Sequence, residues 1–365
     1  MQEKFWGNTG ENSEMTEFTA PDGLLHQEDF VPGSTLRYGA TQVSRDDIIA
    51  FATAFDPQTI HLDEEAAKSS IVGGLCASGF HTCAVMMRLL CDGFLLRSAS
   101  LGSPGIDEVK WSKPLRPNDT VSVAIHVLEA RNLQSRPDVG ISKMMFELVN
   151  QHGETILSAA TNQLMRRRTP DKGVAPERKA KASSAPAPTL WDEPAETAVS
   201  TRGNYFEDIV VGEVRDLGGH TFERDEIIDF ATQFDPQSFH MSEDGGKRSL
   251  FGGLCASGWH TAATFIRQVV AARHLHEAVL RDAGQPLAVW GPSPGFRNLG
   301  WPRPVMMRDR ITFRNKVIEA RVLKSRPDRG LVISQAEGRN QHGEIVYKFT
   351  GQMFVQRRVP GPANI

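Results

Sequence analysis

The apolar positions of the first half of the chain begin with a helical period. After Ser44, apolar residues recur at helical spacing from Ile48 to Ala52. Ser44 and Asp47 also match a capping box, in which a hydroxyl and a carboxylate pair with the first backbone N–H groups of a helix. The pattern predicts a short helix that ends before Asp56–Pro57, because a residue that precedes proline disfavours helical backbone.

A second helical pattern begins near Gly79. The residues FHTCAVMMRLLCDGFLL are apolar on most faces over more than four turns, which is typical of a buried helix. Between the two patterns, DEEAAKSS indicates a short helical run, and Gly73–Gly74 interrupt it. His61 therefore falls on a segment that we expect to be irregular.

Downstream of Ser103–Pro104–Gly105 the period changes to that of strands. KWSKPL, TVSVAIHVLEAR, ISKMMFELVN and ILSAATNQLMRR alternate and are rich in β-branched residues. The turn sequences RPND, SRPDVG and NQHGE separate them. Strands joined by tight turns form an antiparallel sheet. One buried helix wrapped by such a sheet predicts an α+β fold.

The whole pattern occurs twice. The 39 residues from Ser44 align without a gap to those from Glu223, with 24 identities, and a second block from SPG to NQHGE also recurs. The second copy carries extra residues around AVLRDAGQPLAVW, which we interpret as an extended loop after a helix. The predicted organisation is a flexible tail (1–23), a first copy (24–167), a linker (168–203) and a second copy (204–358). The linker is rich in Pro, Ala, Ser and charge, and we expect it to be solvated.

Composition narrows the classes of partner. The formal net charge is −3, so neither nucleic acid nor an anionic membrane is an expected partner. The N-terminus lacks a signal-peptide pattern, and no apolar run approaches the roughly 20 residues of a membrane span. We therefore expect a cytoplasmic protein.

The four cysteines, Cys76, Cys83, Cys91 and Cys255, lack the paired spacing of disulfide or zinc sites, and no metal site is expected. Nucleotide-binding motifs do not occur, and we expect no serine nucleophile elbow.

An acid and an imidazole recur at one spacing. Asp56 and His61 lie in FDPQTIH, and Asp235 and His240 lie in FDPQSFH. An Asp and a His on one anchored loop can hold a water and move a proton. The alternative is a helix-capping Asp beside a packed His. Recurrence of the pair with its surroundings, while nearby apolar residues differ, favours a site.

Two glycines stand where the buried helices are expected to begin. The first N–H groups of a helix lack partners and carry the positive end of its dipole. Gly79 and Gly258 would let a carbonyl oxygen approach those groups. The alternative is that both glycines only permit tight packing. We interpret the adjoining Ser78, Ser257, His81 and His260 as capping or supporting residues.

The stretch FATAFDPQTIHLDEEAAKSSIVGGLCASG and its second copy resemble the signature of MaoC-like dehydratases, which include the R-specific enoyl-CoA hydratases. The resemblance implies two tandem hot-dog domains that form an intrachain pseudo-dimer, with a possible homodimer of such chains. It implies reversible hydration of a 2-enoyl thioester of coenzyme A or acyl carrier protein, with no separate cofactor. The residues that match the water-binding pairs are Asp56, His61, Asp235 and His240, and those that match the oxyanion glycines are Gly79 and Gly258.

The sequence departs from the fuller family motif G-D-x-N-P-hydrophobic-H at three positions of each copy. Phe55 and Phe234 replace the glycine, Gln58 and Gln237 the asparagine, and Thr59 and Ser238 the proline. These changes leave pocket shape and substrate choice open. A non-catalytic acyl-CoA-binding module and a hot-dog thioesterase remain alternative functions. Basic residues that we consider for the carrier phosphates are Lys113, Arg136, Arg303 and Arg326, although solvated turn charges are the alternative.

Overall fold

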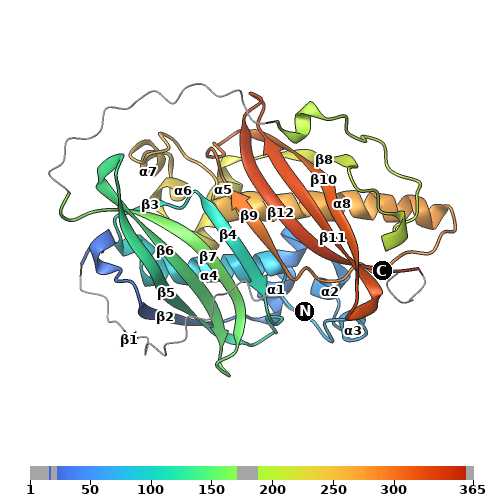
Figure 1. Ribbon diagram of the computed structural model, residues 1–365, viewed down its shortest axis with the longest axis horizontal. Helices are drawn as coiled ribbons and strands as arrows, with labels where there is room; N and C mark the ends of the chain where they lie inside the picture. Colours follow the sequence, from blue (N-terminus) through green and yellow to red (C-terminus); the bar gives the residue numbers. More distant parts are fainter. Residues whose placement is uncertain (1–15, 18–22, 171–187, 359–365) are drawn as a thin grey trace.

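The computed structural model describes residues 16–17, 23–170 and 188–358 and contains two copies of one helix-and-sheet unit (Figure 1). The first copy consists of β1 (Thr16–Glu17), β2 (Ser34–Gln42), α1 (Arg45–Phe55), α2 (Thr59–Leu62), α3 (Glu64–Lys68), α4 (Gly79–Gly93), β3 (Ser100–Gly102), β4 (Gly105–Trp111), β5 (Thr120–Leu133), β6 (Arg136–Asn150) and β7 (Thr155–Arg166). The second consists of β8 (Val214–Thr221), α5 (Arg224–Phe234), α6 (Ser238–Met241), α7 (Glu243–Lys247), α8 (Gly258–Asp282), β9 (Gly295–Gly300), β10 (Arg310–Leu323), β11 (Arg326–Arg339) and β12 (Ile345–Gln356).

The two copies share a single sheet. Its strand order is β1-β2-β5-β6-β7-β4-β9-β12-β11-β10-β8, with β3 beside β7. The joint is the antiparallel pair β4–β9, in which Val109 faces Phe296 and Gly105 faces Gly300. The long helices α4 and α8 lie against one side of this sheet and contact each other (Figure 1). The antiparallel α+β fold and the internal pseudo-dimer are confirmed.

Local sequence signals explain where the short helices begin and end. The Ser44 hydroxyl accepts a hydrogen bond from the Asp47 backbone N–H at 3.1 Å, and the Asp47 carboxylate accepts one from the Ser44 N–H at 2.9 Å. Helix α1 ends at Phe55, directly before Asp56–Pro57. The expectation of an irregular segment at the histidine is wrong, because His61 lies on the four-residue helix α2.

The two central helices differ in length. Helix α4 is 15 residues long and buries ten of them, whereas α8 is 25 residues long. The residues AVLRD at 278–282 therefore continue the helix instead of opening a loop. Residues Gly79–Arg97 do reach the length and mean hydropathy, 1.3, of a membrane span, contrary to expectation, but 67% of that stretch is buried inside the fold. The stretch is the core helix of the first copy.

Part of the expected linker packs against the second copy. The side chain of Leu190 is 6% exposed, and its backbone N–H donates to the Glu337 carboxylate at 2.8 Å. The Trp191 ring lies under the guanidinium groups of Arg314 and Arg339. The expectation of a solvated segment is therefore wrong at Leu190 and Trp191, whereas most of residues 194–202 are exposed. Residues 171–187 and most of the expected tail lie outside the described residues.

Candidate active site

Asp56 lies at the C-terminal end of α1, and its side chain is buried. Its Oδ2 accepts a hydrogen bond from the Ser78 hydroxyl at 2.6 Å, and its Oδ1 accepts one from the Gln58 amide at 2.7 Å. Ser78 also caps α4 by accepting a hydrogen bond from the Phe80 N–H. Two donors therefore hold the carboxylate and stabilise its ionised form.

His61 lies beside this carboxylate, and its ring orientation is set by a backbone group. Its Nδ1 lies 2.8 Å from the Cys76 carbonyl oxygen. Because a carbonyl can only accept, Nδ1 carries the proton, and Nε2 of the neutral ring is an acceptor. Nε2 lies 3.6 Å from Asp56 Oδ2, which is too long for a direct hydrogen bond. Both atoms can accept from one water between them.

The second copy repeats the arrangement. Asp235 Oδ2 accepts a hydrogen bond from the Ser257 hydroxyl at 2.6 Å, and its Oδ1 accepts one from the Gln237 amide at 2.9 Å. His240 Nδ1 donates to the Cys255 carbonyl at 2.7 Å, and its Nε2 lies 3.5 Å from Asp235 Oδ2. Each sequence-predicted acid and imidazole pair is thus brought together.

Glycine is required at the start of each central helix. A Cβ on Gly79 would lie 2.6 Å from the Trp111 ring, and one on Gly258 would lie 2.5 Å from the Trp301 ring. Both glycines also line cavities that contain the Asp and His of their own copy. As the first residue of its helix, each glycine has an N–H without an intrahelical acceptor. Tight packing and access to the backbone amide therefore occur at the same position.

Each cavity is shared between the two copies. The cavity at Asp56 and His61 has a volume of about 480 Å³ and is lined on its other side by residues of α8 and of the second half of the sheet. The cavity at Asp235 and His240 has a volume of about 330 Å³ and is lined by residues of α4 and β7. The acid and imidazole of one copy thus face the interior of the other copy.

Two contacts between the copies were missed by sequence reasoning. The Cys91 thiol of α4 donates to Asp235 Oδ1 at 3.4 Å. The Arg273 guanidinium of α8 donates to Gln58 Oε1 at 3.0 Å. The aligned residues in the opposite copies are Val270 and Phe94. The signal that the sequence offered for these contacts was the change of residue type at these two aligned positions.

The supporting histidines cannot act as acids at neutral pH. Burial lowers the pKa of His81 to about 4 and that of His260 to about 3. His81 stacks on the Phe51 ring at 4.6 Å, and His260 stacks on the Phe230 ring at 4.7 Å. Both are neutral packing residues, as their interpretation as supporting residues predicts.

The buried cysteines are poor nucleophiles. Burial raises the pKa of the Cys76 thiol to about 11 and that of Cys255 to about 12. The thiolate is the reactive form, so neither thiol is activated. Among the described residues, no group of three His, Cys, Asp or Glu side chains is placed to hold a metal ion.

Of the four basic residues considered for the carrier phosphates, two line the cavities and two do not. Lys113 lines the first cavity and pairs with Glu154, and Arg303 lines the second cavity and lies 3.3 Å from Glu344. Arg136 and Arg326 begin strands β6 and β11 and do not line either cavity. Lys113 and Arg303 remain placed to meet a ligand that enters the cavities.

Comparison with known proteins finds similar chains over one copy and over both. A sequence profile described as "MaoC like domain" matches residues 29–145. A MaoC-like dehydratase from Rhodospirillum rubrum is 39% identical, with an alignment that covers 40% of this chain and 99% of that one, at a TM-score of 0.38. A putative MaoC domain protein dehydratase from Chloroflexus aurantiacus J-10-fl covers 94% of this chain and 100% of its own at a TM-score of 0.72, with 16% identity.

The two-copy architecture also has a solved counterpart. A conserved hypothetical protein from Mycobacterium tuberculosis, described as having a double hotdog fold, is 12% identical. It covers 91% of this chain and 99% of its own at a TM-score of 0.65. At these identities the likeness over the full length shows the fold, which is a double hot-dog.

Proposed function

Because this chain belongs to the MaoC-like dehydratase family, we propose that it is an acyl-thioester hydro-lyase that adds water reversibly to a 2-enoyl thioester. The observation that carries the proposal is the pairing of His Nε2 with Asp Oδ2, at 3.6 Å in one copy and 3.5 Å in the other. A water between these atoms would lie in a cavity that also contains a helix-end amide. These are the groups that hydration of a conjugated thioester needs.

The hydrogen bond from His61 Nδ1 to the Cys76 carbonyl leaves Nε2 as an acceptor, which supports His61 as the base in this proposal. His61 Nε2 accepts a proton from the water as the water oxygen bonds to the β-carbon, and Asp56 orients the water. The electron pair of the double bond moves toward the thioester oxygen, where the Gly79 N–H and the positive end of α4 stabilise the charge. The imidazolium then returns the proton to the α-carbon. Asp235, His240 and Gly258 take the same roles in the second copy.

The carrier and the location belong to this proposal as well. Coenzyme A and acyl carrier protein both present a phosphate-bearing arm, and the presence of Lys113 and Arg303 in the cavity linings supports contact with that phosphate. No further cofactor enters the proposed reaction. We place the reaction in the cytoplasm.

The test is removal of both carboxylates. The double variant Asp56→Asn/Asp235→Asn should lose at least a hundredfold in kcat for crotonyl-CoA hydration, measured by loss of enoyl absorbance. Each single variant should keep the turnover of its intact copy. The control is Asp46→Asn, because the Asp46 side chain is 93% exposed and lies outside both cavities.

The alternatives give different results. Full hydration by the double variant would contradict the assigned residues. Release of free coenzyme A thiol by the wild-type chain would identify a thioesterase. Binding of crotonyl-CoA without turnover would identify a binding module.

A further inference from the structure

The interior of the first copy is filled by an aromatic cluster, which we call the plug. It consists of Phe30, Tyr38, Phe94 and Phe146. Phe94 lies at its centre, with ring centroids 5.6 Å from Phe30, 6.4 Å from Tyr38 and 6.5 Å from Phe146. Phe94 and Phe30 are almost completely buried. The plug therefore occupies the space between α4 and the sheet.

The second copy has no plug. The aligned residues are Ile209, Leu217, Arg273 and Ala336, and all four line the cavity of Asp56 and His61. Two further aliphatic positions, Ile125 and Met144, become polar in this cavity as Asn315 and Ser334. Protein interiors are close-packed, so loss of four aromatic rings at aligned positions leaves room for a ligand.

The resulting chamber is long. It follows one side of α8 from Phe265 to His276, which is about 16 Å at a helical rise of 1.5 Å per residue. Its volume of about 480 Å³ exceeds the 330 Å³ of the other cavity. The chamber therefore begins at the Asp56 and His61 pair and continues into the second copy.

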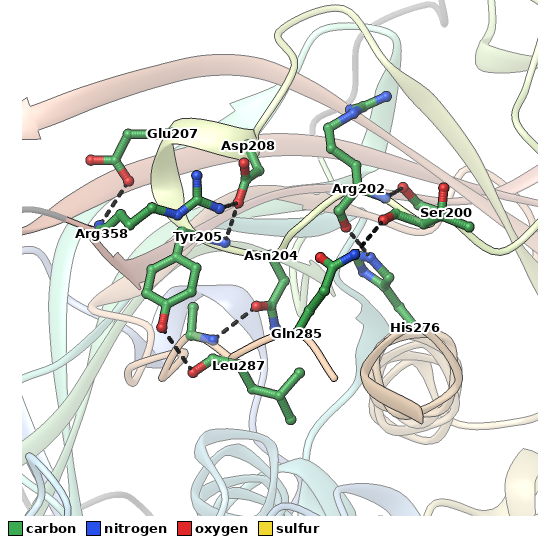
Figure 2. A network of polar contacts seen from close by, with 12 residues as sticks. Ser200, Arg202, Asn204, Tyr205, Glu207, Asp208, His276, Gln285, Leu287 and Arg358 are labelled. Carbon is green, nitrogen blue, oxygen red and sulfur yellow. Dashed lines mark hydrogen bonds and ion pairs between the residues drawn. The ribbon is translucent and has the colours of Figure 1, made fainter. Parts of the chain in front are cut away.

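Figure 2 shows polar contacts among the residues that lead into the second copy, and Asn204, Asp208 and His276 of this group line the chamber. His276 Nε2 donates a hydrogen bond to the Arg202 carbonyl oxygen at 2.7 Å. Asn204 Oδ1 accepts a hydrogen bond from the Ala288 N–H at 2.8 Å, and Trp290 Nε1 donates to the Asn204 carbonyl at 3.2 Å. The hydrogen bond from the Ala288 N–H fixes the Asn204 side-chain amide, so its oxygen faces the backbone and its Nδ2 has no acceptor among the described residues.

Asn204 Nδ2 and Arg273 Nε at this chamber lack hydrogen-bond partners among the described residues, as does Trp111 Nε1 beside Gly79. Asn204 is 2% exposed, and its Nδ2 is buried without a hydrogen-bond partner among the described residues. Arg273 Nε is also buried without one, and the Glu277 carboxylate lies 3.5 Å away. A buried donor without an acceptor is costly, so a ligand with an oxygen acceptor would complete both groups.

On the α4 and β7 walls of the other cavity the buried polar side-chain groups are satisfied. Ser103 and Thr161 share a hydrogen bond of 2.8 Å, and Gln163 donates to Ser100 at 2.7 Å. No residue of that cavity's α4 or β7 wall leaves a buried polar side-chain atom without a partner in the described chain. The plug limits its depth, so it suits a short hydrocarbon chain.

We propose that the two sites differ in the length and polarity of the acyl chain that they accept. The site of Asp56 and His61 takes a long 2-enoyl thioester whose chain carries a carboxylate that Arg273 and Asn204 bind. The site of Asp235 and His240 takes a short hydrocarbon chain. This proposal rests on the proposed hydratase function and names its substrates.

The first experiment separates the sites by silencing one at a time. Asp235→Asn leaves the first site, and Asp56→Asn leaves the second. The probes are crotonyl-CoA, 2-decenoyl-CoA and the coenzyme A monothioester of 2-decenedioic acid. We expect the first site to exceed the second by at least tenfold in kcat/KM on both ten-carbon chains and to prefer the acidic one. Equal chain-length profiles of the two sites would overturn the proposal.

The second experiment rebuilds the plug. Ala336→Phe and, separately, Ser334→Met introduce the residues of the first copy into the chamber. In the Asp235→Asn background, each should lower kcat/KM for 2-decenoyl-CoA at least tenfold more than for crotonyl-CoA. The control is Leu275→Phe, which adds a ring at a position of α8 that is 60% exposed. Equal losses on both chain lengths would contradict a chamber that extends past Ala336.

The third experiment tests the carboxylate. Arg273→Met and Asn204→Asp should each lower kcat/KM for the acidic chain at least tenfold and for 2-decenoyl-CoA less than threefold. Asn204→Asp keeps the acceptor for the Ala288 N–H. An equal loss on both chains would mean that Arg273 acts only through Gln58 on Asp56, and it would overturn the carboxylate assignment.

Binding separates this proposal from the proposed function. The double variant Asp56→Asn/Asp235→Asn is titrated calorimetrically with butyryl-CoA, decanoyl-CoA and the monothioester of decanedioic acid. One tight site for the acidic ten-carbon chain, weakened by Arg273→Met, supports the chamber even if no enoyl thioester is hydrated. Absence of that site overturns the chamber even if crotonyl-CoA is hydrated.

Discussion

At the scale of single residues, one serine connects the start of α4 to the carboxylate that we propose holds the water. The Ser78 hydroxyl donates to Asp56 at 2.6 Å and accepts from the Phe80 N–H at 3.2 Å. Ser257 does the same for Asp235 and Trp259. The hydroxyl therefore fixes the carboxylate relative to the amide of the adjoining glycine, and we regard both serines as positioning residues.

Ser78→Ala/Ser257→Ala should lower kcat for enoyl hydration about tenfold and change KM less than twofold, because a carboxylate without its serine donor holds the water less firmly. Loss of the cap should also lower the free energy of unfolding by about 1 kcal/mol per helix. Steady-state kinetics and urea unfolding measure the two effects.

The matched control is Ser44→Ala, which removes the cap of α1 and does not touch either carboxylate. It should lower stability by a similar amount and leave kcat unchanged. An unchanged kcat in the Ser78→Ala/Ser257→Ala variant would mean that both serines act only as helix caps.

At the scale of elements, the sequence predicted the ends of a helix correctly where the signal lies in a few neighbouring residues. The capping box at Ser44 and the stop before Pro57 each depend on a few neighbouring residues, and α1 begins and ends as they predict. Helix α2 was missed because four residues are too few to display a helical period. The end of α8 was missed because its last residues, AVLRD, have no matching segment in the first copy.

The contacts that distinguish the two sites could not be predicted in the same way. Cys91 lies 144 residues from Asp235, and Gln58 lies 215 residues from Arg273. No local pattern encodes which face of α8 meets which loop of the other copy. Composition likewise predicted a solvated linker, although the apolar Leu190 and Trp191 dock on β10 and β11.

The docked part of the linker gives a second stability prediction. Leu190→Ala should lower the free energy of unfolding of the second copy by about 2 kcal/mol, since the side chain is 6% exposed. The control is Val199→Ala in the same segment, which is 44% exposed and should change stability by less than about 0.5 kcal/mol. Urea unfolding followed by tryptophan fluorescence measures both, and equal small effects would mean that the segment is not docked in solution.

At the scale of the whole molecule, each half buries a neutral histidine on its central helix that packs against a phenylalanine ring. The pKa values of His81 and His260 are lowered to about 4 and about 3 by burial. Below pH 6.5 the unfolded chain binds protons that the folded chain does not. Stability is therefore complete above that pH and falls as pH decreases toward 4.

Between pH 7 and pH 5 we expect a loss of about 2 kcal/mol per histidine in the free energy of unfolding. Urea unfolding at the two pH values measures it. His81→Gln/His260→Gln should flatten this dependence, whereas the exposed pair His152→Gln/His342→Gln should not. An unchanged slope in the first double variant would assign the acid sensitivity to other groups.

The two copies that pair through β4–β9 belong to one polypeptide chain, and this has an evolutionary consequence. In a homodimer every substitution appears twice, so an arginine introduced opposite one catalytic loop is also introduced opposite the other. Duplication within one chain removes that constraint, and Arg273 can face one loop while Phe94 fills the corresponding place in the other half. A mutation in the interior of one half is then expected to impair the site whose Asp and His belong to the other half. Mutations that disable one of the two sites would therefore be found in the half that does not carry its Asp and His.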